Sequence, residues 1–321
     1  MSRTYKATGI NLKSMPMGEA DRLLTILTRE FGLVRAVAMG SRKHNSSMGG
    51  RSGLFVVNDL LIAKGRSLDK VAQAETLESY PGLSQDLKKL TASHYLAELC
   101  LYQALSDQPQ EELFCLLGEH LKRLERSSSE FILPHLTHAV FQLLVLAGIA
   151  PQVYTCCITR QSLTPDFADP SWRIGFSIPA GGTVTLETLA TLRTGQPKPA
   201  PKTASTLLRA TVYTPNQGIG LQQNQSKVAE GGAGSFDTKA MSERTLHQPP
   251  SSLHAQLTAS ELALLQQLAQ ANLPQSVEAA TVWHSVERML RHYAQYHFDR
   301  PIRSATLIDA CFVSDNHPLT P

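Results

Sequence analysis

Apolar and polar residues alternate in short runs over the first 80 positions of the chain. An alternation with a period of two is the pattern of a half-buried β-strand, and glycines or polar clusters between the runs mark turns. The predicted strands are Thr4–Leu12, Leu23–Thr28, Leu33–Met39, Leu54–Lys64 and Lys70–Leu77. Five such strands predict a small closed or partly open barrel. An OB-fold is the first candidate, and an SH3-like barrel fits the strand count almost as well.

From Ser84 onward the apolar positions recur every three to four residues, which predicts helices and an α+β chain overall. Ser84 is the predicted N-cap of the first helix, and Gly148 followed by Pro151 ends the third. The predicted helices are the segment from Ser84 through Leu101, the segment from Pro109 through Leu124, Glu130–Ala147, a helix opened by the capping box Thr258–Glu261, and Val277–Phe298.

Residues 195–257 differ in composition from the rest of the chain. They are rich in Pro, Gly, Gln and Ser and contain almost no aromatic residues. Such a segment buries too little apolar surface to offset the entropy lost on ordering. We therefore predict a disordered insertion at 195–257. The predicted domains are a barrel at 1–80 and a helical domain formed by 81–155 and 258–310.

Positive charge is concentrated near the N-terminus. Residues 1–66 contain eleven Lys/Arg and four Asp/Glu, a local net charge of +7, whereas the whole chain carries +3. Strands that present a mobile basic loop suit a polyanion, with nucleic acid the first candidate and a solvated basic face the alternative. Tyr5 or Phe55 would stack on bases, although core packing is favoured for Phe55. The residues predicted to neutralise phosphates are Arg35, Arg42, Lys43, Arg51, Lys64 and Arg66.

A second group of basic residues lies on and after the last predicted helix. The functional interpretation is a basic strip that extends a nucleic-acid path. The alternative is a solvated face opposite an aromatic core. The secondary DNA-binding candidates are Arg288, Arg291, Arg300 and Arg303.

No motif for catalysis or cofactor binding stands out. The chain lacks GxxxxGKS/T and GxGxxG phosphate loops, a GxSxG elbow and an HExxH helix, and its five cysteines are scattered. We therefore predict no enzyme activity and no cofactor. No signal-like segment opens the chain and no apolar run reaches about 18 residues. A cytoplasmic protein with reduced thiols and no membrane association is expected.

Several motifs resemble the RecO family of bacterial recombination mediators, in order and spacing as well as in residues. They cover most of the chain outside 195–257. Those of the barrel are Gly18-Glu19-Ala20-Asp21, Thr28, Gly32, Gly40, Arg42-Lys43, Gly65-Arg66-Ser67-Leu68 and Gln73-Ala74-Glu75. Those of the remainder are Tyr95-Leu96-Ala97-Glu98-Leu99, Leu113-Phe114-Cys115-Leu116-Leu117, Gly148-Ile149-Ala150-Pro151 followed by Cys156, and Arg300-Pro301-Ile302-Arg303-Ser304.

The resemblance implies an N-terminal OB-fold, a mainly helical body and no catalysis. It also implies binding of single- and double-stranded DNA, annealing of complementary strands and a nucleoid-associated location. The implied partners are RecR, the C-terminal tail of the single-stranded-DNA-binding protein and, indirectly, RecA during repair of gapped DNA.

Many members of that family carry CxxC followed by GGxxCxxC as zinc ligands. Aligned from Pro151, the first two positions fall on Cys156 and Thr159; aligned on Gly181-Gly182, the last two fall on Thr185 and Thr188. A hydroxyl is a poor zinc ligand beside a thiolate. We therefore predict a degenerate zinc-ribbon-like module at 156–194 that binds no metal.

Two other functions fit the residues. In the first, the barrel is an RNA-binding or translation-associated module. Competition between single-stranded DNA and RNA for the protein would distinguish this function from DNA binding. In the second it is an interaction scaffold that binds only protein, which an absence of nucleic-acid affinity at low salt would favour.

Overall fold

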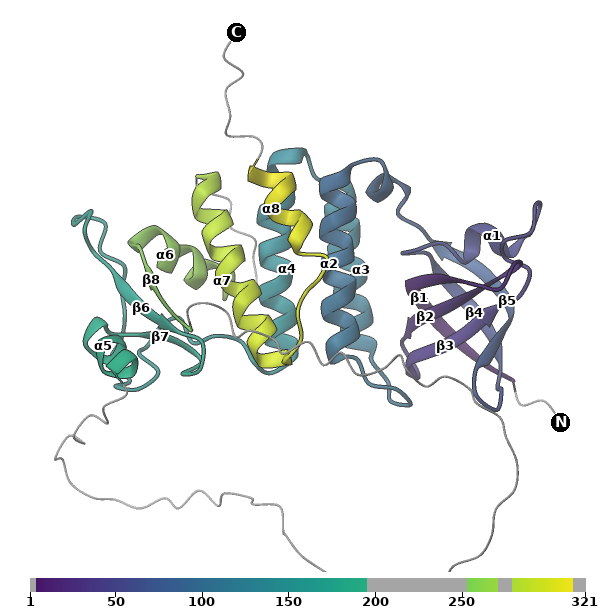
Figure 1. Cartoon of the computed structure of the whole chain (residues 1–321), viewed down its shortest axis with the longest axis horizontal. Coiled ribbons are helices and arrows are strands. Elements are labelled where there is room, and N and C mark those ends of the chain that lie inside the picture. The colour runs from purple at the N-terminus through teal and green to yellow at the C-terminus, as the bar shows by residue number, and fades with distance from the viewer. Residues whose placement is uncertain (1–3, 195–252, 271–278, 314–321) are drawn as a thin grey trace, which may run out of the picture.

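The computed structural model describes residues 4–194, 253–270 and 279–313. Figure 1 shows three parts in a row: a β-barrel at one end, a body of helices in the middle and a small sheet at the other end. The helical body is built from two separate stretches of chain, because α2, α3 and α4 precede the small sheet and α6, α7 and α8 follow it.

The barrel is an OB-fold. Its strands close in the order β1-β2-β3-β5-β4, with β3 and β5 parallel and the other neighbours antiparallel. A five-stranded barrel in this order has the OB-fold topology, which confirms that prediction over the SH3-like alternative. The strands are β1 (Thr4–Met17), β2 (Asp21–Thr28), β3 (Gly32–Ala38), β4 (Val57–Ala63) and β5 (Asp69–Glu78).

Alternation along the strands sends small and branched side chains into the barrel. The interior cluster is closed at one end by α1 (Met48–Arg51), whose Met48 packs against it. Gly9 on β1 faces Ile26 so closely that a Cβ would lie 2.5 Å from the Ile26 Cγ2 atom. The residues of this cluster are Ala7, Leu24, Ile26, Val34, Ala36, Ala38, Leu60, Ile62, Val71 and Ala74.

A second face of the barrel packs on the helical body. Ile10 and Leu12 of β1 and the buried Phe55 belong to the same hydrophobic core as α2, α3 and α4. The turn between β2 and β3 is bonded to the α2–α3 loop, since the Leu33 amide donates to the Leu105 carbonyl at 2.9 Å. Gly32 makes this approach possible: its φ is +64°, and a Cβ there would lie 1.9 Å from the Leu105 oxygen.

The helical body surrounds α4, which packs against α2, α3 and α7. The first helix is capped by Asp86, whose carboxylate accepts from the Lys88 and Lys89 amides, so the predicted N-cap Ser84 is wrong. Ser84 instead ends a short 3₁₀ turn, whereas the capping box at Thr258 and Glu261 is present as predicted. The α-helices of the body are α2 (Leu87–Gln103), α3 (Glu111–Arg126), α4 (Ile132–Leu146), α6 (Ala259–Leu268), α7 (Ala280–Phe298) and α8 (Thr306–Val313).

One stretch among the described residues, Ser129–Leu146, is long and apolar enough to cross a membrane by length and composition. This differs from the expectation that no run reaches that length. In the structure the stretch contains α4, and eleven residues of α4 are buried. Its apolar composition is accounted for by its position at the centre of the helical body.

The small sheet has the order β7-β6-β8 and is flanked by α5 (Leu186–Thr194). Its third strand lies within the segment predicted to be a disordered insertion, because residues 254–257 form four residue pairs with β6. The predicted boundary of the insertion at 257 is therefore wrong. The rest of that segment, 195–252, lies outside the described residues. The strands are β6 (Ile174–Ser177), β7 (Gly182–Val184) and β8 (His254–Leu257).

Candidate nucleic-acid interface

The basic segment between β3 and β4, residues 40–53, is held against the barrel. At its start, the Gly40 amide donates to an Asp21 carboxylate oxygen at 2.7 Å, and the Arg42 amide donates to the Ala20 carbonyl at 2.8 Å. The Arg42 guanidinium also donates to the Gly18 carbonyl at 2.7 Å. These bonds join the start of the segment to the β1–β2 hairpin.

The end of the same segment is anchored by two polar side chains of the barrel. The side-chain amide of Asn11, itself fully buried, donates to the carbonyls of Arg51 and Gly53 at 2.8 Å each. Arg22 donates to the Ser52 hydroxyl at 2.9 Å. The backbone of Arg51 is thus fixed while its side chain remains partly exposed.

Three predicted phosphate contacts, Arg42, Lys43 and Arg51, lie on this segment, and we call them the loop cations. Arg42 and Lys43 are exposed. Arg51 lines a groove that also holds Lys6 and the carboxylates of Asp59 and Glu75. The two carboxylates offset part of the positive charge there, so Arg42 and Lys43 present the stronger positive potential to solvent.

The other three, Arg35, Lys64 and Arg66, form a second group that we call the turn cations. Lys64 and Arg66 are exposed on the turn between β4 and β5. Arg35 is exposed on β3, next to Ala36, which pairs with Asp69 at the start of β5. Parallel pairing of β3 with β5 therefore brings Arg35 near a turn about thirty residues away in sequence.

Neither aromatic candidate offers a free face for stacking. Phe55 is 3% exposed and packs edge-on against the His94 ring, as its core assignment predicted. Tyr5 donates its hydroxyl to Asp69 at 2.6 Å and meets the Phe31 ring edge-on. Burial, with the hydrogen bond to Asp69, raises the pKa of Tyr5 above its usual value.

The proposed basic strip on α7 is interrupted, because Arg291 is buried. Its guanidinium donates to Glu287 at 3.1 Å through Nε and to Asp309 of α8 at 2.9 Å through Nη1. Arg291 is 7% exposed and Glu287 is fully buried. Arg291 therefore joins α7 to α8, and its prediction as a DNA contact is wrong because the side chain is buried. Arg288 on the same helix is exposed.

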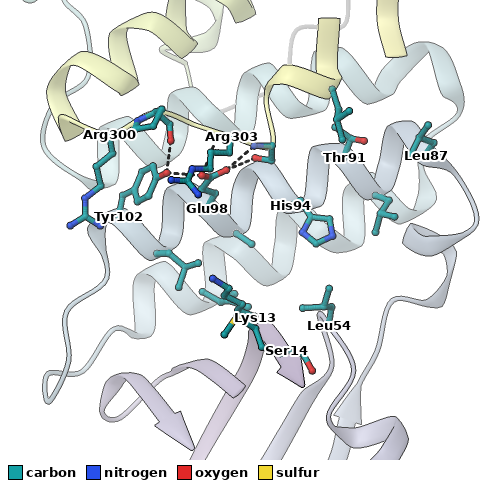
Figure 2. A pocket seen from close by; sticks show the side chains of 18 residues that line it. Lys13, Ser14, Leu54, Leu87, Thr91, His94, Glu98, Tyr102, Arg300 and Arg303 are labelled. Atoms are coloured by element: carbon teal, nitrogen blue, oxygen red, sulfur yellow. Dashed lines mark hydrogen bonds between the residues drawn. The ribbon is translucent and has the colours of Figure 1, made fainter. Parts of the chain in front are cut away.

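Arg300 and Arg303 lie elsewhere, on the segment 299–305 between α7 and α8, which we call the strap. Both line a groove of about 970 Å³ between the barrel and the helical body, together with Lys13 of β1. Figure 2 shows the strap residues on one side of this groove and Lys13 on the other. The Arg300 guanidinium lies 5.5 Å from the centre of the Tyr102 ring.

Glu98 of α2 holds the strap in place. Its carboxylate accepts from the Arg303 amide at 3.0 Å and from the Ser304 amide and hydroxyl at 2.9 and 2.7 Å. Tyr102 also donates to Glu98, at 2.6 Å. Burial alone would raise the pKa of Glu98, but the hydrogen bonds from Ser304 and Tyr102 outweigh it and hold that pKa below its usual value.

Sequence reasoning did not assign roles to Asn11, Arg22, Lys13 and Glu98. Asn11 is a polar residue inside an otherwise apolar run of β1, a local signal for a buried hydrogen-bonding role. Glu98 lies in a helical pattern with no such signal, since its partner Ser304 is 206 residues away.

The fold defines a class: an OB-fold protein whose barrel carries two groups of exposed cations and is joined to a discontinuous helical body. Two family models match the chain, Recombination protein O N terminal over residues 1–80 and Recombination protein O C terminal over residues 84–211. The chain belongs to the RecO family of DNA repair proteins, as the motifs predicted.

Relatives extend the match to the whole chain. The DNA repair protein RecO of Nostoc sp. (strain PCC 7120 / SAG 25.82 / UTEX 2576) is 53% identical over 100% of both chains. That of Acaryochloris marina is 52% identical over 97% of this chain and 96% of its own. That of Gloeobacter violaceus is 40% identical over 97% of this chain and 94% of its own. The family places this protein in DNA repair and recombination.

Proposed function

We propose that the protein binds single- and double-stranded DNA through its barrel, anneals complementary strands without catalysis, and helps RecR to load RecA in the cytoplasm, at the nucleoid. The observation that carries this proposal is the fixed position of the loop cations. Cations held on a rigid backbone lose little conformational entropy when they bind phosphates, and the phosphate backbone supplies most of the sequence-independent affinity for DNA.

Both groups of cations belong to this proposal. Arg35, Lys43, Lys64 and Arg66 make no side-chain hydrogen bond or ion pair with the part of the chain that the structure describes. They are therefore free to contact phosphates. Annealing requires that two strands be held without reading of their bases, which contacts to the phosphates alone allow.

Charge reversal of the loop cations, R42E/K43E/R51E, is expected to weaken binding to all DNA sequences alike. The slope of log K against log salt for single-stranded DNA should shrink by about 0.7 for each phosphate that the variant no longer neutralises, or about 2 for three phosphates. Fluorescence anisotropy with a labelled oligonucleotide, repeated over a range of salt, measures this slope.

The matched control, R126E/R160E/R173E, changes the net charge equally on exposed residues outside the barrel. It should leave the slope nearly unchanged. An unchanged slope in the loop variant, or an equally reduced slope in the control, would contradict the proposal. Tighter binding of RNA than of DNA would support the RNA-binding rival, and no affinity for either at low salt would support the protein scaffold.

The groove beside the strap is our proposed site for the tail of the single-stranded-DNA-binding protein, taken as an acidic peptide with an apolar end. Lys13, Arg300 and Arg303 supply positive charge at the groove. Large apolar side chains there suit an apolar anchor better than a stacked base, which prefers an aromatic face. The exposed apolar residues of the groove are Met15, Leu54, Leu87 and Leu307.

The double variant R300E/R303E is expected to weaken binding of a synthetic tail peptide by on the order of tenfold or more, because it removes charge-assisted hydrogen bonds to the peptide carboxylates. Calorimetric titration of the peptide, with Arg126→Glu as control, measures the change. If DNA affinity falls and peptide affinity does not, the groove belongs to the nucleic-acid path instead.

A further inference from the structure

The four positions that align with zinc ligands meet in the structure as two facing turns. The first turn, Cys156–Thr159, is closed by a hydrogen bond from the Thr159 amide to the Cys156 sulfur at 3.4 Å. In the second, Thr185–Thr188, the two hydroxyls are 2.8 Å apart and the Thr188 amide lies 3.3 Å from the Thr185 hydroxyl. We call them the first and second knuckles.

The knuckles are bonded to each other through the backbone. The Cys157 amide donates to the Thr183 carbonyl at 2.9 Å, just before the second knuckle. The Thr183 hydroxyl also donates to the Thr155 carbonyl at 3.2 Å, just before the first knuckle. The residues on either side of Cys156 are therefore both bonded to Thr183, which holds the two turns side by side.

The Cys156 thiol, which lies between the two knuckles, is buried and already accepts a hydrogen bond. Cys156 is fully buried, and Thr188 is 3% exposed. Burial raises the pKa of the Cys156 thiol, but hydrogen bonds from Thr159 and from the amides of Thr185 and Ile158 outweigh it and lower the pKa to about 7. The sulfur accepts a hydrogen bond from the Thr159 amide on the side where a metal would bind a thiolate.

This donor set does not fit zinc. Structural zinc takes four thiolate or imidazole ligands, whereas here one thiol faces three neutral hydroxyls. Two of those hydroxyls, of Thr185 and Thr188, are bonded to each other. Among the described residues no group of three or more His, Cys, Asp or Glu is arranged to hold a metal ion.

We propose that the two knuckles form a metal-independent version of a four-ligand zinc site, in which hydrogen bonds within and between the two turns hold the backbone that the metal would otherwise hold. Two consequences follow. The protein folds without zinc, and its backbone remains close enough to ligand geometry that cysteine at the three threonine positions restores tetrahedral metal binding. This inference is independent of the proposed DNA contacts.

The test compares the wild-type protein with T159C/T185C/T188C. The wild type should contain well under one zinc per chain by elemental analysis, and chelator should leave its melting temperature unchanged. The triple variant should bind about one zinc, lose stability on chelation, and with Co²⁺ show the thiolate charge-transfer and tetrahedral d–d bands.

The matched control, T164C/T191C/T194C, adds three cysteines to the same module outside the knuckles. It should bind no metal tightly. If the triple variant folds poorly, T159C/T185C offers three thiolates and the same cobalt spectrum in a milder form. Stoichiometric zinc in the wild type, lost together with stability on chelation, would overturn the proposal. So would knuckle variants that bind Co²⁺ no better than the control.

Discussion

Replacing Arg291 with alanine is expected to lower the free energy of unfolding by about 3–5 kcal/mol, the cost of leaving a buried charge without its partner. The substitution removes the cation from Glu287, which is fully buried, and breaks the bond from α7 to Asp309 on α8. Burial already raises the pKa of Glu287. Urea unfolding monitored by far-ultraviolet circular dichroism measures the change.

Two variants separate this charge effect from simple loss of a side chain. Arg288→Ala, on the exposed face of the same helix, should change stability by less than about 0.5 kcal/mol. The double variant E287L/R291M, which replaces the pair by apolar residues of similar volume, should recover most of the loss. Equal destabilisation by the single and double variants would show that the packing of α7, rather than its ion pair, sets the cost.

Lowering the pH from 7 to 5 is expected to destabilise the protein by roughly 2 kcal/mol through His120, which lies between α3 and α4, with a smaller further loss through the neighbouring His135 and His138. Burial, His138 and Arg123 lower the pKa of His120 to about 3. Burial and Arg123 lower the pKa values of His135 and His138 to about 4 each. The folded state keeps these rings neutral, so below about pH 6.5 the unfolded chain binds more protons and stability falls until the folded pKa values are reached.

The slope of unfolding free energy against pH between 5 and 6.5 tests this expectation. His120→Leu should reduce the slope by about one proton, or about 1.4 kcal/mol per pH unit. The prediction fails if stability is the same at pH 5 and pH 7, or if His120→Leu and wild type have equal slopes.

Local patterns predicted the barrel and the long helices well. Alternation in the runs around Leu23 and Leu33 is enough to define β2 and β3, because each strand buries one face against the same interior. Strand β8 was missed because it is four residues long and pairs with β6 about eighty positions earlier. Its neighbours in sequence have a disorder-prone composition, and no local signal identifies such a short partner strand.

The candidate site was predicted less completely. Composition indicated which basic residues are exposed on the loop, but not that Asn11 and Arg22 hold that loop in place. Arg291 resembles its neighbour Arg288 in sequence, and only tertiary contacts such as the bond from Arg291 to Asp309 of α8 distinguish a buried ion pair from a surface cation. Both differences depend on tertiary contacts that one sequence does not reveal.

The division of the helical body has a consequence for the order of synthesis. A ribosome releases every strand of the barrel early, so that unit can close while most of the chain is still untranslated. α4 is synthesised long before α7, the helix that packs against it. Glu98 is likewise synthesised 206 residues before Ser304, its hydrogen-bond partner. During that interval the apolar surface of α4 is exposed, and the nascent protein would depend on chaperones that bind such surfaces. The long stretch of chain between α4 and α7 therefore affects the kinetics of folding during translation rather than the stability of the folded protein.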